Sequence, residues 1–413
     1  MRIVIAGSGS QGDTRPYLAL AAGLKERGHE TVACLDGSGA ALADDLCVEF
    51  HELAGDFRRH LDGGRGTRAL EKADGGFTGL MFFRTLAREH TESWLATITD
   101  VARAHRADVV IGSGLATFSA ITAAELTGAQ SAVASAFPLT PTTAFASPVS
   151  PRVPPRLLNR ATHEIATRGL WSAFSGPTNR ARRRRGLPSL TVRWSHQSAL
   201  YGFSPALLDA PKDWSDAVRV CGEWHLAEPA FEPSAALVRF LDEAAAAGDP
   251  PVYVGFGSMA ASGTAEFSAT ILRAVGDRRV VLAPGWSGID QELGELPDSV
   301  HVVGQVPHAW LLPQCSVAFH HCGAGTTHAV ARAGIPSVPV PFAADQPFWA
   351  RRLHTVGIAS APLDRRRVET DQVRAALAAA DAAPTRGRAA DVAERMRADD
   401  PIAAVIEHLS TRG

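Results

Sequence analysis

The sequence predicts an α/β protein with two Rossmann-like, doubly wound domains facing a cleft. Short apolar or β-branched runs alternate with helical stretches in the first half of the chain, and the second half repeats this alternation. In each half, one apolar run breaks into a small-residue turn and then a helical stretch. Helices long enough to serve as crossovers make neighbouring strands parallel and cover both faces of each sheet.

The expected strands share short length and β-branched or apolar content. In the first half they cover residues 2–6, 30–35, 49–53, 108–111, 129–137 and 199–203, and in the second half residues 252–256, 279–282, 300–303, 317–320 and 337–340. Such runs separated by helical stretches are typical of a parallel sheet.

A connector is expected between the halves, because residues 220–233 contain two prolines and show no periodicity. We therefore expect an N-terminal domain over 1–225, a linker over 226–245 and a C-terminal domain over 246–413. A helical pattern over 371–382 should break at Pro384 and continue over 392–409. This last helix is expected to pack on either domain, including back on the N-terminal one.

Composition excludes several classes of protein. The 413 residues have a formal net charge of -2 and an isoelectric point near 6.7, which gives no electrostatic reason to expect nucleic acid or an anionic membrane. No apolar run approaches the roughly 20 residues that span a bilayer, so no stable membrane insertion and a cytoplasmic location are expected. The five cysteines are scattered and odd in number, which predicts reduced thiols. A monomer or a homodimer is compatible with the sequence.

Two further segments carry structural expectations. Residues 140–155 are rich in proline, serine and threonine, and proline is excluded from helix interiors and central strands. This segment is expected to be a loop that shapes a cleft. The arginine run 182–185 ends a helical stretch, where cations favour the helix dipole, and we expect it to be solvated.

The turn in the second half, His320 through Thr327, predicts an anion site. A strand that breaks into small residues and then a helix presents unpaired backbone N–H groups and the positive end of the helix dipole. Such a terminus most often binds phosphate. Farther along, Asp345 and Gln346 stand side by side after the next apolar run, and they offer acceptors and donors for a polyhydroxylated ring. Together these residues indicate a nucleotide-sugar site.

The neighbouring His320, His321 and Cys322 are all zinc-ligand types. Adjacent residues on a strand point to opposite faces, so the three do not converge easily on one ion. No metal is expected at this site.

The turn in the first half, residues 7–12, fits the G-x-G-x-x-G pattern after a strand. With Asp36 at the end of the second strand, it keeps an NAD-dependent oxidoreductase open as an alternative. Asp13 counts against that alternative, because its carboxylate would occupy the place of the pyrophosphate. Asp13 or Thr14 is also expected as the N-cap of the following helix, with Pro16 at an early helical position.

Four blocks together resemble the GT-B glycosyltransferases of the family-1 group, which includes bacterial glycopeptide and macrolide antibiotic glycosyltransferases and sterol glucosyltransferases. The blocks are residues 7–16, 252–259, 320–327 and 341–349. Their order and spacing cover nearly the whole chain, and their combination is far more specific than any one block.

The resemblance implies a GT-B fold and an inverting, metal-independent transfer of a hexose or deoxyhexose from a UDP- or TDP-sugar to a hydroxyl of an apolar small molecule, without a cofactor. It implies Asp13 as the catalytic base. The implied donor-binding residues are Ser258, Trp286, Gln305, Val306, His321, Gly323, Gly325, Thr326, Asp345 and Gln346. The acceptor-side residues are Ser10, Gln11 and Phe137.

Departures from the family pattern leave the donor sugar open. Cys322 and Gln11 replace residues common in bacterial relatives, and Ala324 and Gly325 replace the tryptophan and asparagine of plant relatives. The aromatic residues Phe82, Phe83 and Trp94 serve equally well as acceptor contacts or as core. A non-catalytic protein with a degenerate site is a third hypothesis, disfavoured by the presence of Asp13, His321, Asp345 and Gln346.

Overall fold

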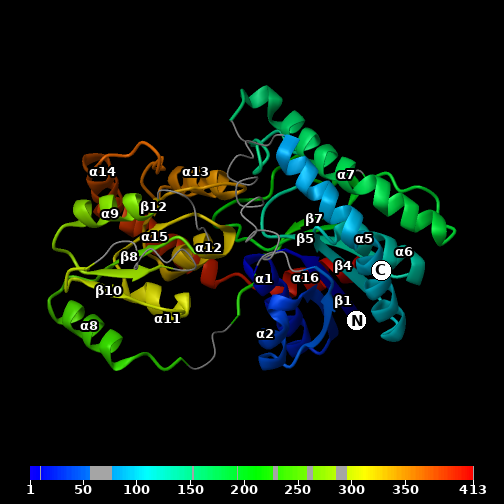
Figure 1. Ribbon diagram of the computed structural model, residues 1–413, viewed down its shortest axis with the longest axis horizontal. Helices are drawn as coiled ribbons and strands as arrows, with labels where there is room; N and C mark the ends of the chain where they lie inside the picture. Colours follow the sequence, from blue (N-terminus) through cyan, green and yellow to red (C-terminus); the bar gives the residue numbers. More distant parts are fainter. Residues whose placement is uncertain are drawn as a thin grey trace. The chain divides into compact units, whose positions relative to one another are not determined.

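The chain forms two compact units in the computed structural model (Figure 1). The structure describes residues 1–9, 11–55, 77–150, 153–192, 194–226, 231–257, 264–284 and 295–412. Unit 1 comprises Met1–Pro205, Asp209–Leu226 and Asp400–Gly413, and unit 2 comprises Ala206–Leu208 and Ala227–Asp399.

Unit 1 contains a parallel sheet in the order β3-β2-β1-β4-β5-β6-β7. Its strands are β1 (Arg2–Ser8), β2 (Glu30–Asp36), β3 (Glu49–Leu53), β4 (Val109–Gly114), β5 (Gln130–Ser135), β6 (Ala199–Tyr201) and β7 (Val218–Val220). The order runs outward from β1 in one direction and then outward from β4 in the other, so the topological switch lies between β1 and β4.

Helices cover both faces of this sheet. They are α1 (Gln11–Glu26), α2 (Ala40–Asp45), α5 (Phe77–Ala104), α6 (Thr117–Thr127), α7 (Asn159–Arg184) and α16 (Pro401–Ser410). Along β1, Ile3 and Ile5 face the core shared with α1 and α16, whereas Val4 and Ala6 face the core shared with α5 and α6. This alternation follows from the two-residue period of a strand.

The C-terminal helix α16 packs on unit 1, where it lies beside α1 (Figure 1). Val405 and Leu409 are buried in the unit 1 core. Asp400 accepts a hydrogen bond from the Ala403 amide at the start of the helix, and its carboxylate lies 2.9 Å from the Arg27 guanidinium. Because that ion pair is half exposed, buried apolar area contributes most of the docking energy.

Unit 2 contains a parallel sheet in the order β10-β9-β8-β11-β12. Its strands are β8 (Val252–Gly255), β9 (Val280–Ala283), β10 (Val300–Val302), β11 (Val317–His320) and β12 (Ser337–Pro339). Its helices are α8 (Ala235–Ala246), α9 (Thr264–Val275), α11 (His308–Leu311), α12 (Ala324–Ala333), α13 (Gln346–Val356), α14 (Thr370–Asp381) and α15 (Ala383–Arg397). The switch of this sheet lies between β8 and β11.

The predicted strands are confirmed in both halves, with ends that differ by a few residues. Strand β7 was not expected, because three residues of an edge strand carry too little pattern. The range expected as a linker contains most of α8, whose Leu237 and Leu241 are buried in the unit 2 core. The amphipathic pattern of 235–246 therefore signals a packed helix.

The break expected near Pro384 is present, because α14 ends at Asp381 and Ala382 is extended, with a ψ of 139°. Helix α15 begins at Ala383, with Pro384 in its first turn, where its missing N–H has no partner to lose. A second break, at Asp400 before Pro401 begins α16, was not expected. The expectation about the first helix was wrong. Helix α1 begins at Gln11, so Asp13 lies inside its first turn and is not the N-cap.

The arginine run is not wholly solvated. Arg182 is 2% exposed; its Nε donates to the Pro188 carbonyl at 2.8 Å, and its Nη2 lies 2.8 Å from Glu125. Four consecutive residues cover the whole circumference of a helix. Because α7 packs on α5 and α6, one of the four must face the core. All five cysteines are free, as predicted.

Candidate functional site

The loops that follow the strands of unit 2 meet at one edge of its sheet, because all five strands run in parallel. In such sheets ligands bind outside the carboxyl ends of the strands, at the topological switch. Here the switch lies between β8 and β11, so the adjoining segments are Phe256–Gly257 and His321–Gly323.

His321 occupies this switch. A Cβ built on Gly257 would lie 3.1 Å from the His321 Cε1, and one built on Gly323 would lie 2.6 Å from its Nε2. The imidazole thus lies against two turns that need glycine, and Gly257 also has a φ of 61°. Burial, followed by the charge of His308, lowers the pKa of His321 to about 4. The ring is neutral at pH 7.

The Nδ1 atom of His321 is buried and has no hydrogen-bond partner among the described residues. An unpaired buried polar atom costs about 1–3 kcal/mol, so a partner supplied by a ligand would recover that energy. A neutral imidazole offers one donor and one acceptor, and the tautomer decides which nitrogen donates.

His320, by contrast, is a structural residue. It is fully buried, its Nδ1 accepts from the Cys322 amide at 3.2 Å, and its Nε2 lies 3.0 Å from the Ser337 hydroxyl. These contacts satisfy both ring nitrogens, and burial lowers the pKa of His320 to about 3. Cys322 is buried as well, with a φ of 64°. The three zinc-ligand types therefore have separate surroundings.

Helix α12 begins directly after this turn. Its N-cap is Gly323, which provides no side-chain cap, and its first turn contains no acidic residue. A Cβ on Gly325 would meet no described atom within 4 Å, so the packing of the described residues does not explain the glycine there. Thr326 lies on the same first turn. The first N–H groups of α12 are therefore suited to receive an anion.

The loop after β12 lies next to this turn, because β11 and β12 are neighbours. The Oε1 of Gln346 accepts hydrogen bonds from the Phe342 and Ala343 amides at 2.8 and 3.1 Å. Its Nε2 has no recorded partner in the described part of the chain. Ala344 has a φ of 55°, a conformation that costs a non-glycine residue about 1–3 kcal/mol.

Asp345 is the N-cap residue of α13, although its side chain makes no capping hydrogen bond. Its charge helps to raise the pKa of the Cys322 thiol, after the larger effect of burial, so the two loops lie within electrostatic range. The structure thus brings Asp345 and Gln346 to the same sheet edge as His321.

The loop after β10 contributes Gln305 and Val306 to this edge. Gln305 is exposed, and Val306 packs against the α8 side of the core. His308 follows them, and its Nε2 lies 3.2 Å from the Tyr253 hydroxyl. Ser258 and Trp286, the remaining donor-side predictions, lie outside the described residues.

His308 and Gly257 were not among the predicted site residues. His308 affects the titration of both His320 and His321, and Gly257 makes room for His321. The rule that ligands bind beyond strand ends would have indicated both residues, since each follows a predicted strand.

In unit 1 the corresponding edge holds the turn after β1. Gly7 lies one residue before the end of β1, and Gly114 ends β4. A Cβ on Gly114 would lie 2.7 Å from the Ser8 carbonyl oxygen. Helix α1 begins there with Gln11, and Asp13 lies in its first turn. Ser10 and the side chains of Gln11 and Asp13 are outside the described part of the structure.

Asp36 caps its own turn. It is 4% exposed, its Oδ1 accepts from the Ser38 amide at 3.0 Å at the start of the following 3₁₀ turn, and its Oδ2 is buried without a partner among the described residues. The carboxylate on which the NAD-dependent alternative depends is therefore buried in its own turn.

Phe137 lies just beyond β5, at the carboxyl edge of the unit 1 sheet, and is partly buried. Its backbone is held by Ser135, whose hydroxyl donates to the Phe137 carbonyl at 2.8 Å and accepts from its amide at 3.2 Å. Trp94 belongs to the core, with its Nε1 donating to the Ala54 carbonyl at 2.6 Å.

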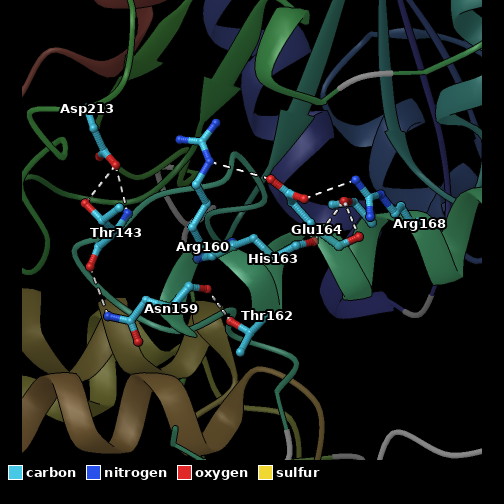
Figure 2. Close-up of polar contacts among 9 residues, drawn as sticks. Thr143, Asn159, Arg160, Thr162, His163, Glu164, Arg168 and Asp213 are labelled. Atoms are coloured by element: carbon cyan, nitrogen blue, oxygen red, sulfur yellow. Dashed lines mark hydrogen bonds and ion pairs between the residues drawn. The ribbon is translucent and has the colours of Figure 1, made fainter. Parts of the chain in front are cut away.

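The proline-rich loop after Phe137 is held at Thr143 by Asp213 on one side and by Asn159 on the other (Figure 2). Asp213 accepts hydrogen bonds from the Thr143 amide and hydroxyl at 2.8 and 3.0 Å and from the Thr142 hydroxyl at 2.6 Å. Although burial opposes it, these bonds lower the pKa of Asp213. Asn159, at the start of α7, donates to the Thr143 carbonyl at 3.0 Å. The loop conformation is thus defined by side-chain hydrogen bonds.

Two family models match the chain. Residues 3–145 match the glycosyltransferase family 28 N-terminal domain, and residues 272–411 match the erythromycin biosynthesis protein CIII-like C-terminal domain.

Individual proteins agree with these models. A sterol 3-beta-glucosyltransferase of Cryptococcus neoformans is 31% identical over 98% of the chain, which spans about a quarter (27%) of that relative's length. The solved glycosyltransferase of kitacinnamycin is 22% identical with a TM-score of 0.72, covering 99% of this chain and 98% of its own. The glycosyltransferase VinC, solved with DTDP, is 20% identical with a TM-score of 0.68 over the full length of both chains.

Both ends of the chain thus match glycosyltransferase domain models, and the chain has the fold of the solved GT-B glycosyltransferases. The sheets of both units agree with that fold. The NAD-dependent alternative is not supported by any of these matches. Among the described helices, none combines the length and apolar content that crossing a bilayer requires.

Proposed function

We propose that this protein transfers a hexose or deoxyhexose from a UDP- or TDP-sugar to a hydroxyl group of an apolar small molecule, with inversion at the anomeric carbon and without a metal ion. The observation that carries the proposal is His321, a neutral imidazole placed against two glycine turns at the amino end of α12, whose buried Nδ1 has no partner in the described part of the chain. A diphosphate bound there would accept hydrogen bonds from the helix amides and from the imidazole.

The donor side has the chemistry that the leaving group requires. As the glycosidic bond breaks, the nucleotide diphosphate gains negative charge, which oriented N–H groups stabilise without reorganisation. Gly325 leaves the helix terminus open, and the Gln346 Nε2 and the Asp345 carboxylate lie on the neighbouring loop. These two groups would bind the hydroxyls of the sugar.

The acceptor side is assigned to unit 1. Asp13, in the first turn of α1, would remove the proton of the acceptor hydroxyl as that oxygen attacks the anomeric carbon. Phe137 and the anchored loop beyond it supply apolar surface near the same sheet edge. The relatives named for sterol glucosylation support an apolar acceptor.

The test is calorimetric titration with UDP, TDP and NAD. UDP or TDP should bind and NAD should not. The variant His321→Ala should weaken diphosphate binding about 10- to 100-fold, because hydrogen bonds to charged groups contribute about 1.5–3 kcal/mol. The control is His354→Ala, which removes an exposed histidine at the end of α13 and should leave affinity unchanged.

Transfer is then measured by mass spectrometry, with each nucleotide sugar and a pool of apolar hydroxylated compounds. We expect an added hexose or deoxyhexose that persists in EDTA. Binding of NAD in place of UDP and TDP, or equal UDP affinity in His321→Ala and the parent protein, would contradict the proposal.

A further inference from the structure

A second cluster of reactive side chains lies beside the edge strand β3, and none of its members belongs to the candidate site. Glu49 begins β3, His51 lies two residues further on, and His105 directly follows α5. The His51 Nε2 lies 3.1 Å and the His105 Nε2 lies 3.0 Å from the same Glu49 Oε1. The two imidazole rings are 6.4 Å apart with an angle of 72° between their planes.

The fold explains why these residues meet. Residues two apart on a strand share a face, so Glu49 and His51 project to the side on which Leu53 packs with α5. At the end of α5, the Arg106 and Ala107 amides bond back to the carbonyls of Arg103 and Ala102, and this turn ends the helix next to His105. The convergence joins residues more than fifty positions apart.

We propose that Glu49, His51 and His105 form a zinc site, with two imidazoles, one carboxylate and a water as the fourth ligand. These are the ligand types that zinc prefers, and three protein ligands with an open fourth position are a common coordination pattern. Tetrahedral ligands about 2.1 Å from zinc lie about 3.4 Å from one another. The separations of 3.0 and 3.1 Å from the Glu49 Oε1 are slightly shorter than that value, and all three ligand atoms lie within 4.8 Å of one another.

Access and chemistry agree with this assignment. The side chains are 52% exposed for Glu49, 40% for His51 and 29% for His105, so an ion and its water can reach them. Zinc would bind the Nε2 lone pairs, and the proton of each neutral ring would reside on Nδ1.

The consequence is a cross-link between the edge strand and the long helix that covers the sheet. Binding to the folded chain alone stabilises that fold in proportion to the logarithm of ligand concentration. At zinc concentrations 100-fold above the dissociation constant, the thermal midpoint of the transition that includes unit 1 should rise by about 5 °C.

The experiment uses the full chain, stripped with EDTA, dialysed and titrated with zinc chloride in a calorimeter. We expect one equivalent to bind, and Co²⁺ to give the intense visible absorption of a tetrahedral site. His51→Gln and His105→Gln should each weaken binding at least 10-fold. Controls are His196→Gln, which changes an exposed histidine elsewhere in unit 1, and Cys47→Ser, which removes an exposed thiol.

Failure of zinc to bind, or equal affinity in the double variant His51→Gln/His105→Gln, would overturn the site. Weak octahedral Co²⁺ absorption in the parent protein would overturn it too, without depending on how any variant folds. UDP binding, measured on the same variants, should stay unchanged, which separates this outcome from that of the proposed transferase activity.

Discussion

The two units place the same structural feature, a strand followed by a turn and a helix, at the switch point of a parallel sheet, but with opposite chemistry. In unit 1 the first turn of α1 contains Asp13. In unit 2 the first turn of α12 contains no acid, and His321 lies against its glycines. Both helices direct their positive end at the switch of their own sheet, and the two first turns differ in whether they contain an acidic residue type.

Both units have non-glycine residues with positive φ, but at different places. In unit 2, Cys322 and Ala344 lie in the loops at the carboxyl edge of the sheet, whereas in unit 1 Cys47 and Arg106 precede β3 and β4. Residues in such conformations persist where the surroundings hold them and are common at functional sites. In unit 2 the surroundings are specific: His320 accepts from the Cys322 amide, and Gln346 accepts from the Phe342 and Ala343 amides.

The comparison teaches that a Rossmann-like unit does not by itself define an anion site. The charge and the side-chain volume in the first helical turn decide it. Under the proposed function, unit 1 would accept a proton and unit 2 would hold a diphosphate.

The largest effect is expected for Asp13→Asn in unit 1. Loss of a general base reduces turnover by about 10²- to 10⁴-fold. Affinity for UDP or TDP should stay the same, because Asp13 and the donor-binding residues belong to different units. The measurements are initial rates by mass spectrometry and calorimetric titration of the diphosphate.

The control for this variant is Asp44→Asn, which makes the same chemical change at an exposed position near the end of α2. It should retain the parent rate. Full turnover in Asp13→Asn would remove Asp13 from the mechanism and with it the assignment of proton transfer to unit 1.

A smaller effect is expected from two matched changes in the unit 2 turn. Gly323→Ala puts a methyl group 2.6 Å from the His321 Nε2, so the ring must shift and UDP affinity should fall about 10-fold. Gly325→Ala meets no described atom and should stabilise α12 by about 0.5–1 kcal/mol, because alanine is the better helix former.

Gly325→Ala should nevertheless weaken UDP binding, since its methyl group would occupy the space proposed for phosphate. Thermal unfolding and calorimetry on both variants separate these effects. If Gly325→Ala binds UDP as tightly as the parent protein, the phosphate does not lie over the first turn of α12.

The smallest effect concerns acid stability around α12. Burial lowers the pKa of His320 to about 3 and that of His328 to about 4, below the unfolded value of about 6.5. The unfolded chain therefore takes up protons first as the pH falls. The stabilisation is complete above about pH 6.5 and is lost toward pH 4, at up to about 1.4 kcal/mol per pH unit for each residue.

Urea unfolding at pH 7.5 and 5.5 measures this dependence. The variant His328→Leu should show a pH dependence smaller by about 1 kcal/mol over that interval. His196→Gln, at an exposed position, should keep the parent dependence. An unchanged pH dependence in His328→Leu would show that this buried histidine does not titrate on unfolding.

Much of the fold could be predicted from local patterns. The strand at residues 49–53 was predicted with its observed bounds, and the strand at 317–320 likewise, because apolar or alternating runs ended at clear turn residues. Strand β7 and the start of α15 could not be predicted. A three-residue edge strand has little pattern, and a proline is equally compatible with a position before a helix and with the first turn of a helix.

The candidate site could be predicted only in part. The motifs indicated His321, Gly323 and Asp345, which the structure brings to one sheet edge. The glycine pattern did not reveal why glycine is needed at 257, because the reason is a ring contributed by another strand. The four arginines 182–185 looked equivalent in sequence, yet the packing of α7 buries one of them.

The sequence by itself determined the alternation of strands and helices, the small-residue turns and the acid in one of them, because these depend on neighbours a few residues apart. The tertiary structure alone decided which of two adjacent histidines is satisfied and which keeps a buried nitrogen without a partner among the described residues. It also brought His105 to Glu49 and His51. Burial and convergence depend on residues distant in the chain, and local periodicity contains no information on which of them will meet.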